Sequence, residues 1–135
     1  MTLIDAGPLV ALTDHRDPHH KACVAVLPSL LGPLVTTWAN LTEAMHILGS
    51  RGGWRAQSPL MTWVCDGRLQ VDGIETTDLP RLRDLMAKYA DVPMDIGDAC
   101  LVALAERLGT DLVFTVDADF RLYRLKGRRA FRVVP

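Results

Sequence analysis

The sequence lacks any long apolar segment. No hydrophobic run approaches the roughly 20 residues that a membrane helix requires, and neither an internal repeat nor a low-complexity stretch is present. The first apolar run contains an acid, Asp5, and no basic leader precedes it, which disfavours a secretory signal. We therefore expect a cytoplasmic protein that does not associate with a membrane.

Cysteine is scarce. The three cysteines, Cys23, Cys65 and Cys100, are an odd number and lack the close spacing of paired metal ligands. This pattern favours reduced thiols in a cytosol over a disulfide framework. We expect all three to be ordinary core residues.

A strong charge of either sign is also absent, because the formal net charge is −1 at pH 7. The charges are nevertheless unevenly distributed. No acid follows Asp119, and the end of the chain carries Arg121, Arg124, Lys126, Arg128, Arg129 and Arg132. Such a run is usually a solvated tail and edge strand. Beside an acidic metal site it becomes a candidate surface for a polyanion.

Hydrophobic residues make up 49% of the 135 positions and charged residues only 23%. This balance is typical of a compact globule, and the length suffices for a sizeable core. We expect one domain that spans residues 1–135.

The stretch from Met94 to Phe120 predicts one helix followed by one buried strand. Apolar residues from Leu101 to Leu108 recur at three- and four-residue steps, as on a helix face packed against a core, and Gly109 is a typical stop. The run from Leu112 to Val116 is nearly all apolar and rich in β-formers. Such strands are typical of parallel sheets covered on both faces, so the sequence predicts an α/β fold.

Other elements follow from local signals. We expect strands at 2–4, 34–36 and 69–71. Helices are expected from Pro18 to about Leu27, with Asp17 as the cap, and from Trp38 to about Leu48, ended by Gly49–Gly53. A further helix should run to about Val64, with Ser58 as N-cap and Pro59 in its first turn, and another should follow Asp78 as its cap, with an apolar stripe to Tyr89. Zinc binding by the adjacent His19 and His20, with His15 nearby, is disfavoured because neighbouring histidines do not readily face one ion.

Four carboxylates fall where this fold binds its ligands. In open parallel sheets, ligands bind outside the carboxyl ends of the strands. Asp5 and Asp117 each stand at such an end, and Asp98 lies in the first turn of a helix that begins on the same rim. Glu43 follows the strand at 34–36 by about two helical turns. We expect all four to converge on one edge of the sheet.

Three of these acids, Asp98, Asp117 and Glu43, also have a plain structural explanation. Asp95 and Asp98 have the spacing of an N-cap and an N3 acid, and an acid there stabilises a helix by roughly 0.3–1 kcal/mol. Asp117 and Asp119 are ordinary turn formers, and Glu43 alone reads as a solvated helix residue. These separate explanations would have to place several acids on one rim by coincidence, which favours a functional site.

Carboxylates that converge without Lys or Arg between them repel one another unless a cation neutralises them. Oxygen ligands favour Mg²⁺ or Mn²⁺ over zinc, and such an ion suits hydrolysis of a phosphodiester. Other folds with an acidic rim fit less well. A haloacid-dehalogenase-like phosphatase needs a second Asp where Gly7 stands, and a response-regulator receiver needs an acidic pair and a late lysine that are not evident.

Four fragments together resemble a known family. They are LIDAGPLVAL with Asp5, TEAMHIL with Glu43, IGDACLVALAERLG with Asp98, and FTVDADF with Thr115 and Asp117. In order and spacing they are similar to the PIN-domain ribonucleases, and more narrowly to the VapC-type toxins of bacterial toxin–antitoxin pairs. The resemblance implies a PIN-like three-layer α/β fold with a parallel central sheet flanked by helices, frequent homodimers, RNA cleavage that depends on Mg²⁺ (Mn²⁺ as a substitute), and inhibition by a small cognate antitoxin.

The resemblance also assigns roles. Asp5, Glu43, Asp98 and Asp117 match the family's catalytic acids, and Asp5, Asp98 and Asp117 are the expected metal ligands. The four intact acids argue against the alternative of a catalytically silent scaffold that binds RNA or a protein partner. A nuclease directed at DNA would differ only in its substrate.

Four further residues complete the expected site. Thr115 supports it through its hydroxyl, and Asp119 shares the role of Asp117, because the TVDADF segment is more compact than in many relatives. Arg121 and Arg124 are the expected contacts to RNA phosphates, since cations supply most of the affinity for a polyanion.

Overall fold

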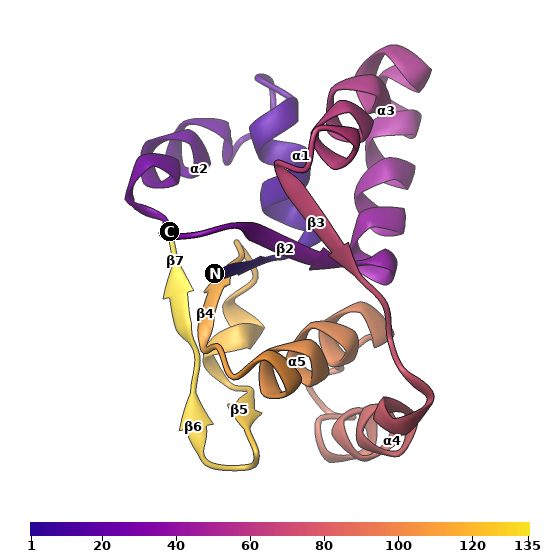
Figure 1. Cartoon of the computed structure of the whole chain (residues 1–135), viewed down its shortest axis with the longest axis vertical. Coiled ribbons are helices and arrows are strands. Elements are labelled where there is room, and N and C mark those ends of the chain that lie inside the picture. The colour runs from indigo at the N-terminus through magenta and orange to yellow at the C-terminus, as the bar shows by residue number, and fades with distance from the viewer.

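Five parallel strands form the central sheet, in the order β3-β2-β1-β4-β7 (Figure 1). The computed structural model describes residues 1–135. The strands are β1 (Thr2–Ile4), β2 (Leu34–Thr37), β3 (Leu69–Asp72), β4 (Leu112–Phe114) and β7 (Arg132–Val134). All pairings are parallel, and Leu3 on the central strand lies opposite both Val35 and Val113. The predicted sheet class is confirmed.

Helices cover both faces of this sheet. The helices are α1 (Ala6–Thr13), α2 (His20–Val26), α3 (Trp38–Cys65), α4 (Leu79–Lys88) and α5 (Ile96–Leu108). Figure 1 shows α1, α2 and α3 on one side of the sheet and α4 and α5 on the other. The result is the expected three-layer arrangement. None of the helices combines the length and the apolar character that a membrane span requires.

The core consists of two apolar clusters, one on each face of the sheet. Leu3 and Val113 belong to the cluster under α4 and α5, whereas Ile4 and Phe114 belong to the cluster under α1, α2 and α3, and all four are fully buried. Successive strand residues point to opposite faces. Short strands that are apolar at every position therefore serve both clusters at once.

Helix α5 has the ends that its sequence predicts. The Asp95 carboxylate accepts a hydrogen bond from the Asp98 N–H at 2.8 Å, and Gly109 ends the helix with φ 70°. This left-handed conformation suits glycine because it has no Cβ. Leu101 and Leu104 are fully buried, so the cap and the apolar face together hold the first turn of α5 against the edge of the sheet.

The predicted helix end near Leu48 was a few residues too early, although the break falls within the predicted stop at Gly49–Gly53. Helical geometry continues through Gly49, and the backbone departs from it only at Gly52 (φ −159°, ψ 18°) and Gly53 (φ 62°, ψ −152°). The helix then resumes, so Pro59 lies inside it and Ser58 is not its N-cap. The Gln57 amide donates to the Met45 carbonyl at 2.9 Å and ties the two halves together, a tertiary contact that no local signal reveals.

Two other predicted boundaries were also shifted, whereas α4 begins directly after Asp78, as predicted, but without the expected side-chain cap. Helix α2 begins at His20, after Asp17 accepts a hydrogen bond from the His19 N–H at 2.9 Å. The Asp78 side chain accepts from the Glu75 N–H at 2.9 Å, within a short 3₁₀ turn, instead of capping α4. Strand β4 ends at Phe114, two residues early, because the chain turns toward the site described below.

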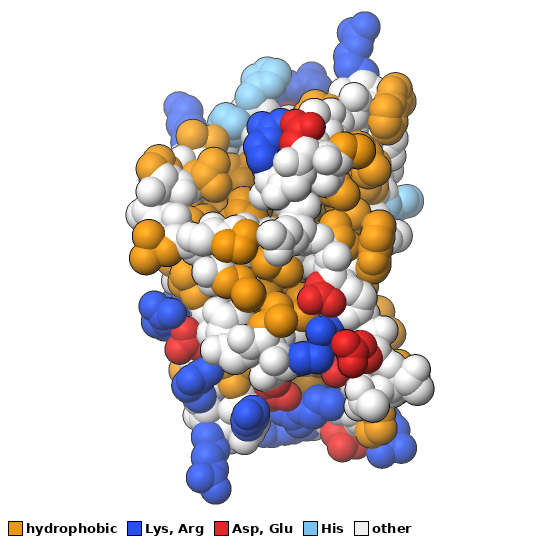
Figure 2. Space-filling model, viewed as in Figure 1, with side chains coloured by type: hydrophobic (Ala, Val, Ile, Leu, Met, Phe, Trp, Pro, Cys, Tyr) orange, Lys and Arg blue, Asp and Glu red, His pale blue; other side chains and the backbone are white.

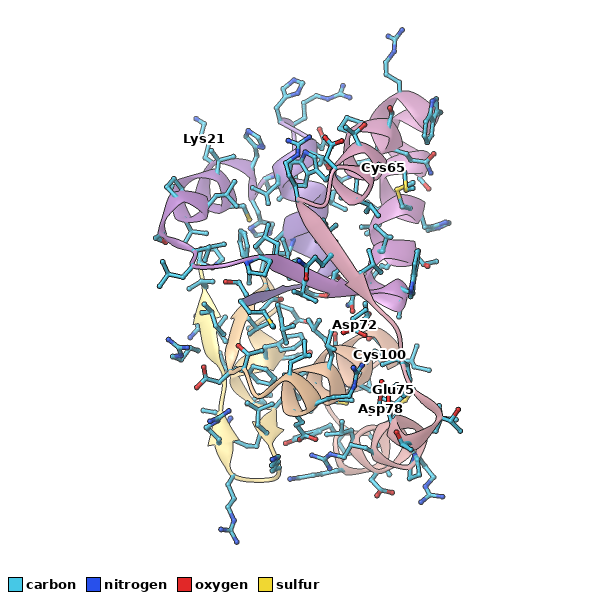
Figure 3. The ribbon with its side chains drawn as sticks, in the orientation of Figure 1. Lys21, Cys65, Asp72, Glu75, Asp78 and Cys100 are labelled. Carbon is cyan, nitrogen blue, oxygen red and sulfur yellow. The ribbon has the colours of Figure 1, made fainter.

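The cysteines are free, as expected, but they are not all core residues. Cys23 and Cys100 are buried, whereas Cys65 is exposed at the end of α3 (Figure 3). The last turn of a kinked helix leaves this side chain outside both apolar clusters.

The basic end of the chain forms a hairpin and an edge strand. Strands β5 (Arg124–Leu125) and β6 (Arg129–Ala130) pair antiparallel, and β7 then joins the sheet at its edge. Figure 2 shows Lys and Arg side chains gathered at the end of the molecule where this hairpin lies. Arg132 is anchored by Asp111 at 2.8 Å.

Candidate active site

The sheet edge carries a cavity of about 220 Å³ whose lining is mostly acidic, and we call it the acidic cavity. Its acids are Asp5, Glu43, Asp95, Asp98 and Asp117. The fold thus brings together the four acids expected at this edge, from β1, α3, α5 and the segment after β4. Asp95 joins them while it also caps α5. Asp119 does not line this cavity.

Asp5 is held by three hydrogen-bond donors. One carboxylate oxygen accepts from the Ala6 N–H at 2.8 Å and from the Asn40 amide at 3.0 Å, and the other accepts from the Thr115 hydroxyl at 2.8 Å. The side chain is only 7% exposed. Burial raises the pKa of Asp5, and the Thr115 and Ala6 donors offset only part of this effect. The donors fix the carboxylate in place, at the centre of the rim.

Thr115 links Asp5 to the acid that follows β4. Its hydroxyl donates to Asp5 and accepts from the Asp117 N–H at 3.0 Å. The Asp117 carboxylate in turn accepts from the Asp119 N–H at 2.9 Å. Asp119 thus contributes its backbone to the turn that holds Asp117 in the cavity.

Asp98 lies opposite, in the first turn of α5, and is also 7% exposed. Its carboxylate accepts a hydrogen bond from the Tyr123 hydroxyl at 2.7 Å. Burial raises the pKa of Asp98 to about 7, with further contributions from nearby acids that include Asp95 and Asp5, while the Tyr123 hydrogen bond lowers it. A carboxyl group with this pKa is poised to lose its proton when a cation binds.

Glu43 is the most accessible of the four predicted acids. The pKa of Glu43 is raised first by burial and then by the charges of Asp5, Asp95 and Asp117. No Lys or Arg forms a salt bridge with any acid of this cavity. The carboxylates therefore repel one another without compensation from the protein.

Two residues that the sequence did not single out hold these acids. Asn40 is fully buried: its amide donates to Asp5, and its oxygen accepts from the Thr37 hydroxyl. Its position three residues before Glu43, on the same helix face, was an available signal. Tyr123 is fully buried against the rings of Tyr89 and Phe120, with centroids 5.0 and 5.1 Å away. No sequence pattern pairs it with an acid 25 residues earlier.

The donor set of the acidic cavity fits a hydrated divalent ion. Every ligand offered is a carboxylate oxygen, the type that Mg²⁺ and Mn²⁺ prefer. Gly97 keeps the space open, because a Cβ there would lie 3.3 Å from an Asp95 oxygen and 3.4 Å from the Asn40 nitrogen. No three acidic, histidine or cysteine side chains are grouped tightly enough to ligate one ion together. Mg²⁺ usually takes one or two carboxylates and keeps several waters, so this spacing suits it.

A second group of acids differs from the acidic cavity in that its carboxylates have a basic partner within the protein. Asp72 ends β3, and Glu75 and Asp78 follow it before α4, beside α5 (Figure 3). Arg107 stands among them, 3.3, 3.7 and 3.5 Å from their respective oxygens. An arginine forms a salt bridge with each acid of this group, whereas the acidic cavity has no such partner. The difference favours a bound cation at the acidic cavity alone.

Comparison with known proteins identifies the family. The model of the PIN domain matches residues 2–126. The chain belongs to the PIN domain family. A curated relative, Ribonuclease VapC26 of Mycobacterium tuberculosis, is 26% identical over 134 residues, which cover 98% of this chain and 99% of that protein.

Solved structures share the PIN fold of this chain. The crystal structure of M. tuberculosis VapC20, described as a toxin that cleaves the sarcin-ricin loop, aligns with a TM-score of 0.85 at 17% identity over 100% of both chains. A toxin–antitoxin complex from Klebsiella pneumoniae aligns at 0.69, with 16% identity over 89% of this chain and 90% of that one. VapBC2 of Rickettsia felis, bound to promoter DNA, aligns at 0.70, with 12% identity over 99% and 98%.

The contact between Tyr123 and Asp98 predicts a shifted pH profile. Tyr123→Phe keeps the aromatic packing but removes the donor that lowers the pKa of Asp98. The pKa of Asp98 should then rise above 7, and the acidic limb of any metal-dependent activity should move to higher pH. At pH 7 we expect about fivefold lower activity, recovered at pH 9. A uniform loss across the pH range would instead indicate a packing defect.

Proposed function

We propose that this PIN domain protein is a Mg²⁺-dependent endoribonuclease and the toxin of a toxin–antitoxin pair. The observation that carries the proposal is the acidic cavity, with five carboxylates and no basic partner. Support comes from the 26% identical relative, which is named a ribonuclease, and from the VapC20 structure, whose description names a toxin that cleaves the sarcin-ricin loop. Mn²⁺ should substitute for Mg²⁺, because both prefer oxygen ligands.

The four predicted acids each have a role in this proposal. Asp5, Asp98 and Asp117 would hold the hydrated ion, in part through its bound waters, and Glu43 is placed to accept a proton from the attacking water. A bound divalent ion would supply an activated water and stabilise the phosphate oxygens during in-line displacement. Thr115 and Asn40 orient Asp5 as described, so the chain fixes its ligands before substrate arrives.

The partners follow from the same assignment. We propose one nuclease domain over residues 1–135, a cytoplasmic location, a homodimer and a small cognate antitoxin. For the antitoxin, support comes from two solved neighbours: one is described as a toxin–antitoxin complex, and the other as VapBC2. Arg121 is exposed and is proposed to contact RNA. Arg124 is the weaker candidate, because its guanidinium donates to the carbonyls of Arg121 and Tyr123 at 2.8 and 2.9 Å.

Cleavage of RNA by purified protein tests this function. We expect fragments from a total RNA pool in Mg²⁺, none in EDTA, and restored cleavage when excess Mg²⁺ is added back. A matched pool of single-stranded DNA should remain intact. Protein that binds RNA in Mg²⁺ without cutting it would favour the silent scaffold, and cleavage of DNA alone would reassign the substrate.

Bound Mg²⁺ should raise the thermal stability of the fold, whereas a rise in pH should lower the stability of the metal-free fold. The folded-state pKa of Asp98 is about 7, above its ordinary value of 3.8, so the metal-free fold binds an extra proton between these values. Its stability should therefore fall as pH rises from about 4 to 7. At pH 8, Mg²⁺ at about tenfold its Kd should raise Tm by about 5 °C. Thermal unfolding in EDTA and in Mg²⁺ measures both effects, and an unchanged Tm in Mg²⁺ would contradict metal binding.

A further inference from the structure

A second cavity of about 250 Å³ adjoins the acidic cavity, and we call it the flanking cavity. The two share Val116 and Asp117 as a common wall. His19, from the turn before α2, and Arg121, from the 3₁₀ turn after β4, line the flanking cavity. Asp117 therefore separates the acidic cavity, which is lined by carboxylates, from the flanking cavity, which is lined by an arginine and a histidine.

The side chains of His19 and Arg121 have no partner within the protein. Neither forms a hydrogen bond through its side chain or a salt bridge, and only the backbone groups of these residues are paired. Several other arginines are engaged; Arg51, for example, contacts Asp14 and Asp17, at 3.0 and 2.9 Å. Unpaired donors that line a cavity are available to a ligand.

The remaining lining is apolar. Val116, Val133 and Pro135 contribute walls without charge. The cavity is smaller than the roughly 300–1,000 Å³ of pockets that enclose a drug-sized ligand. It suits a small unit with one anionic end and one less polar end, such as a phosphate with its ribose.

We propose that the flanking cavity is a nucleotide subsite, which holds the phosphate and ribose next to the scissile phosphate. The proposal rests on the proposed ribonuclease function and adds the direction in which the RNA strand leaves the acids. Arg121 binds the neighbouring phosphate through paired N–H groups, and His19 donates a further hydrogen bond. Val133 and Pro135 contact the sugar.

RNA is favoured over an acidic protein segment by continuity. A strand whose scissile phosphate lies at the acidic cavity must continue past its rim, and past Asp117 it meets these donors at once. A volume of about 250 Å³ has room for only a small unit of one strand, so the proposed RNA is unpaired there. Single-stranded loops and ends are the usual targets of sequence-specific RNA recognition.

RNA affinity of matched variants tests the subsite. The probe is a fluorescein-labelled single-stranded RNA decamer in Mg²⁺, with Asp98→Asn protein so that the RNA is not consumed. Arg121→Ala is compared with Arg128→Ala, which removes the same charge from the exposed hairpin, and His19→Ala is compared with His15→Ala on the same loop. All four positions are exposed, and unchanged Tm values confirm the fold.

We expect Arg121→Ala to weaken binding about tenfold and His19→Ala about threefold, with less than twofold for both controls. The double variant should lose less than the product of the two, because both residues contact one phosphate. In the wild-type background, Arg121→Ala and His19→Ala should raise the KM for RNA and leave kcat nearly unchanged.

Equal losses in all four variants would show a general attraction of charges and overturn the subsite. Cleavage of RNA with no effect of Arg121→Ala or His19→Ala would overturn it while the proposed function stands. Unchanged RNA affinity with weakened binding of the proposed cognate antitoxin would assign the cavity to that partner. Protein that neither binds nor cleaves RNA would overturn both proposals.

Discussion

Asp98→Asn is expected to abolish RNA cleavage while the fold is kept, with a loss of at least about 100-fold in rate. The asparagine oxygen can still accept the hydrogen bond from Tyr123, so the local packing survives. The lost negative charge removes a proposed ligand of the ion. In EDTA the variant should be more stable than wild type at pH 8, since one repelling carboxylate is gone, and Mg²⁺ should raise its Tm much less.

Asp95→Asn is the matched control for this substitution. Asp95 lines the same cavity and precedes Asp98 by one turn, and asparagine replaces aspartate well as an N-cap. We expect less than a tenfold loss of cleavage. If both variants cleaved RNA at the wild-type rate, the assignment of Asp98 would be refuted; if both were equally inactive, the cavity would depend on total charge and not on Asp98 as a ligand.

Growth arrest by the chain alone, and its removal by Asp5→Asn, is the second large effect that we expect. An unrestrained ribonuclease harms its host, so induced expression should slow growth, and co-expression of the small gene product encoded beside this chain should restore it. Asp5 accepts three hydrogen bonds at the centre of the site. Its replacement should remove both the proposed ligand and the toxicity. Colony counts after induction measure the effect.

Asp5→Asn needs a control for folding. The asparagine NH₂ would face groups that already donate, so we expect the variant to lose stability as well as charge. Asp98→Asn, which keeps its acceptor for Tyr123, should be equally harmless to cells at a matched level of soluble protein. Toxicity that survives both substitutions would show that the harm arises elsewhere.

The elements that the sequence predicted well are those decided by local physics. The cap at Asp95, the apolar face from Leu101 to Leu108 and the stop at Gly109 lie within one segment, and the structure has each of them. The helix end near Leu48 was predicted too early because Gly49 and Gly52 look equivalent along the chain. The contact between Gln57 and Met45, across the kink, accompanies the position found.

The residues of the candidate site also fall into two groups, those that local sequence could place and those that depend on tertiary packing. Parallel strands end at one edge, so Asp5 and Asp117 could be placed there from their strands alone. Asn40 shares a helix face with Glu43, which was an available signal, but its contact with Asp5 depends on how α3 packs against β1. The role of Tyr123 depends on how the chain folds back after β4. Residues that orient a catalytic side chain are seldom adjacent to it in sequence.

The chemical ends of the cleaved RNA test the central claim most directly, since they report which nucleophile attacked. The account predicts that wild-type protein in Mg²⁺ produces a linear phosphate on one side of each cut and a hydroxyl on the other, because water is the nucleophile, and that Asp98→Asn protein prepared in parallel produces neither. Products that carry a 2′,3′-cyclic phosphate, or cuts that persist in EDTA, would contradict it.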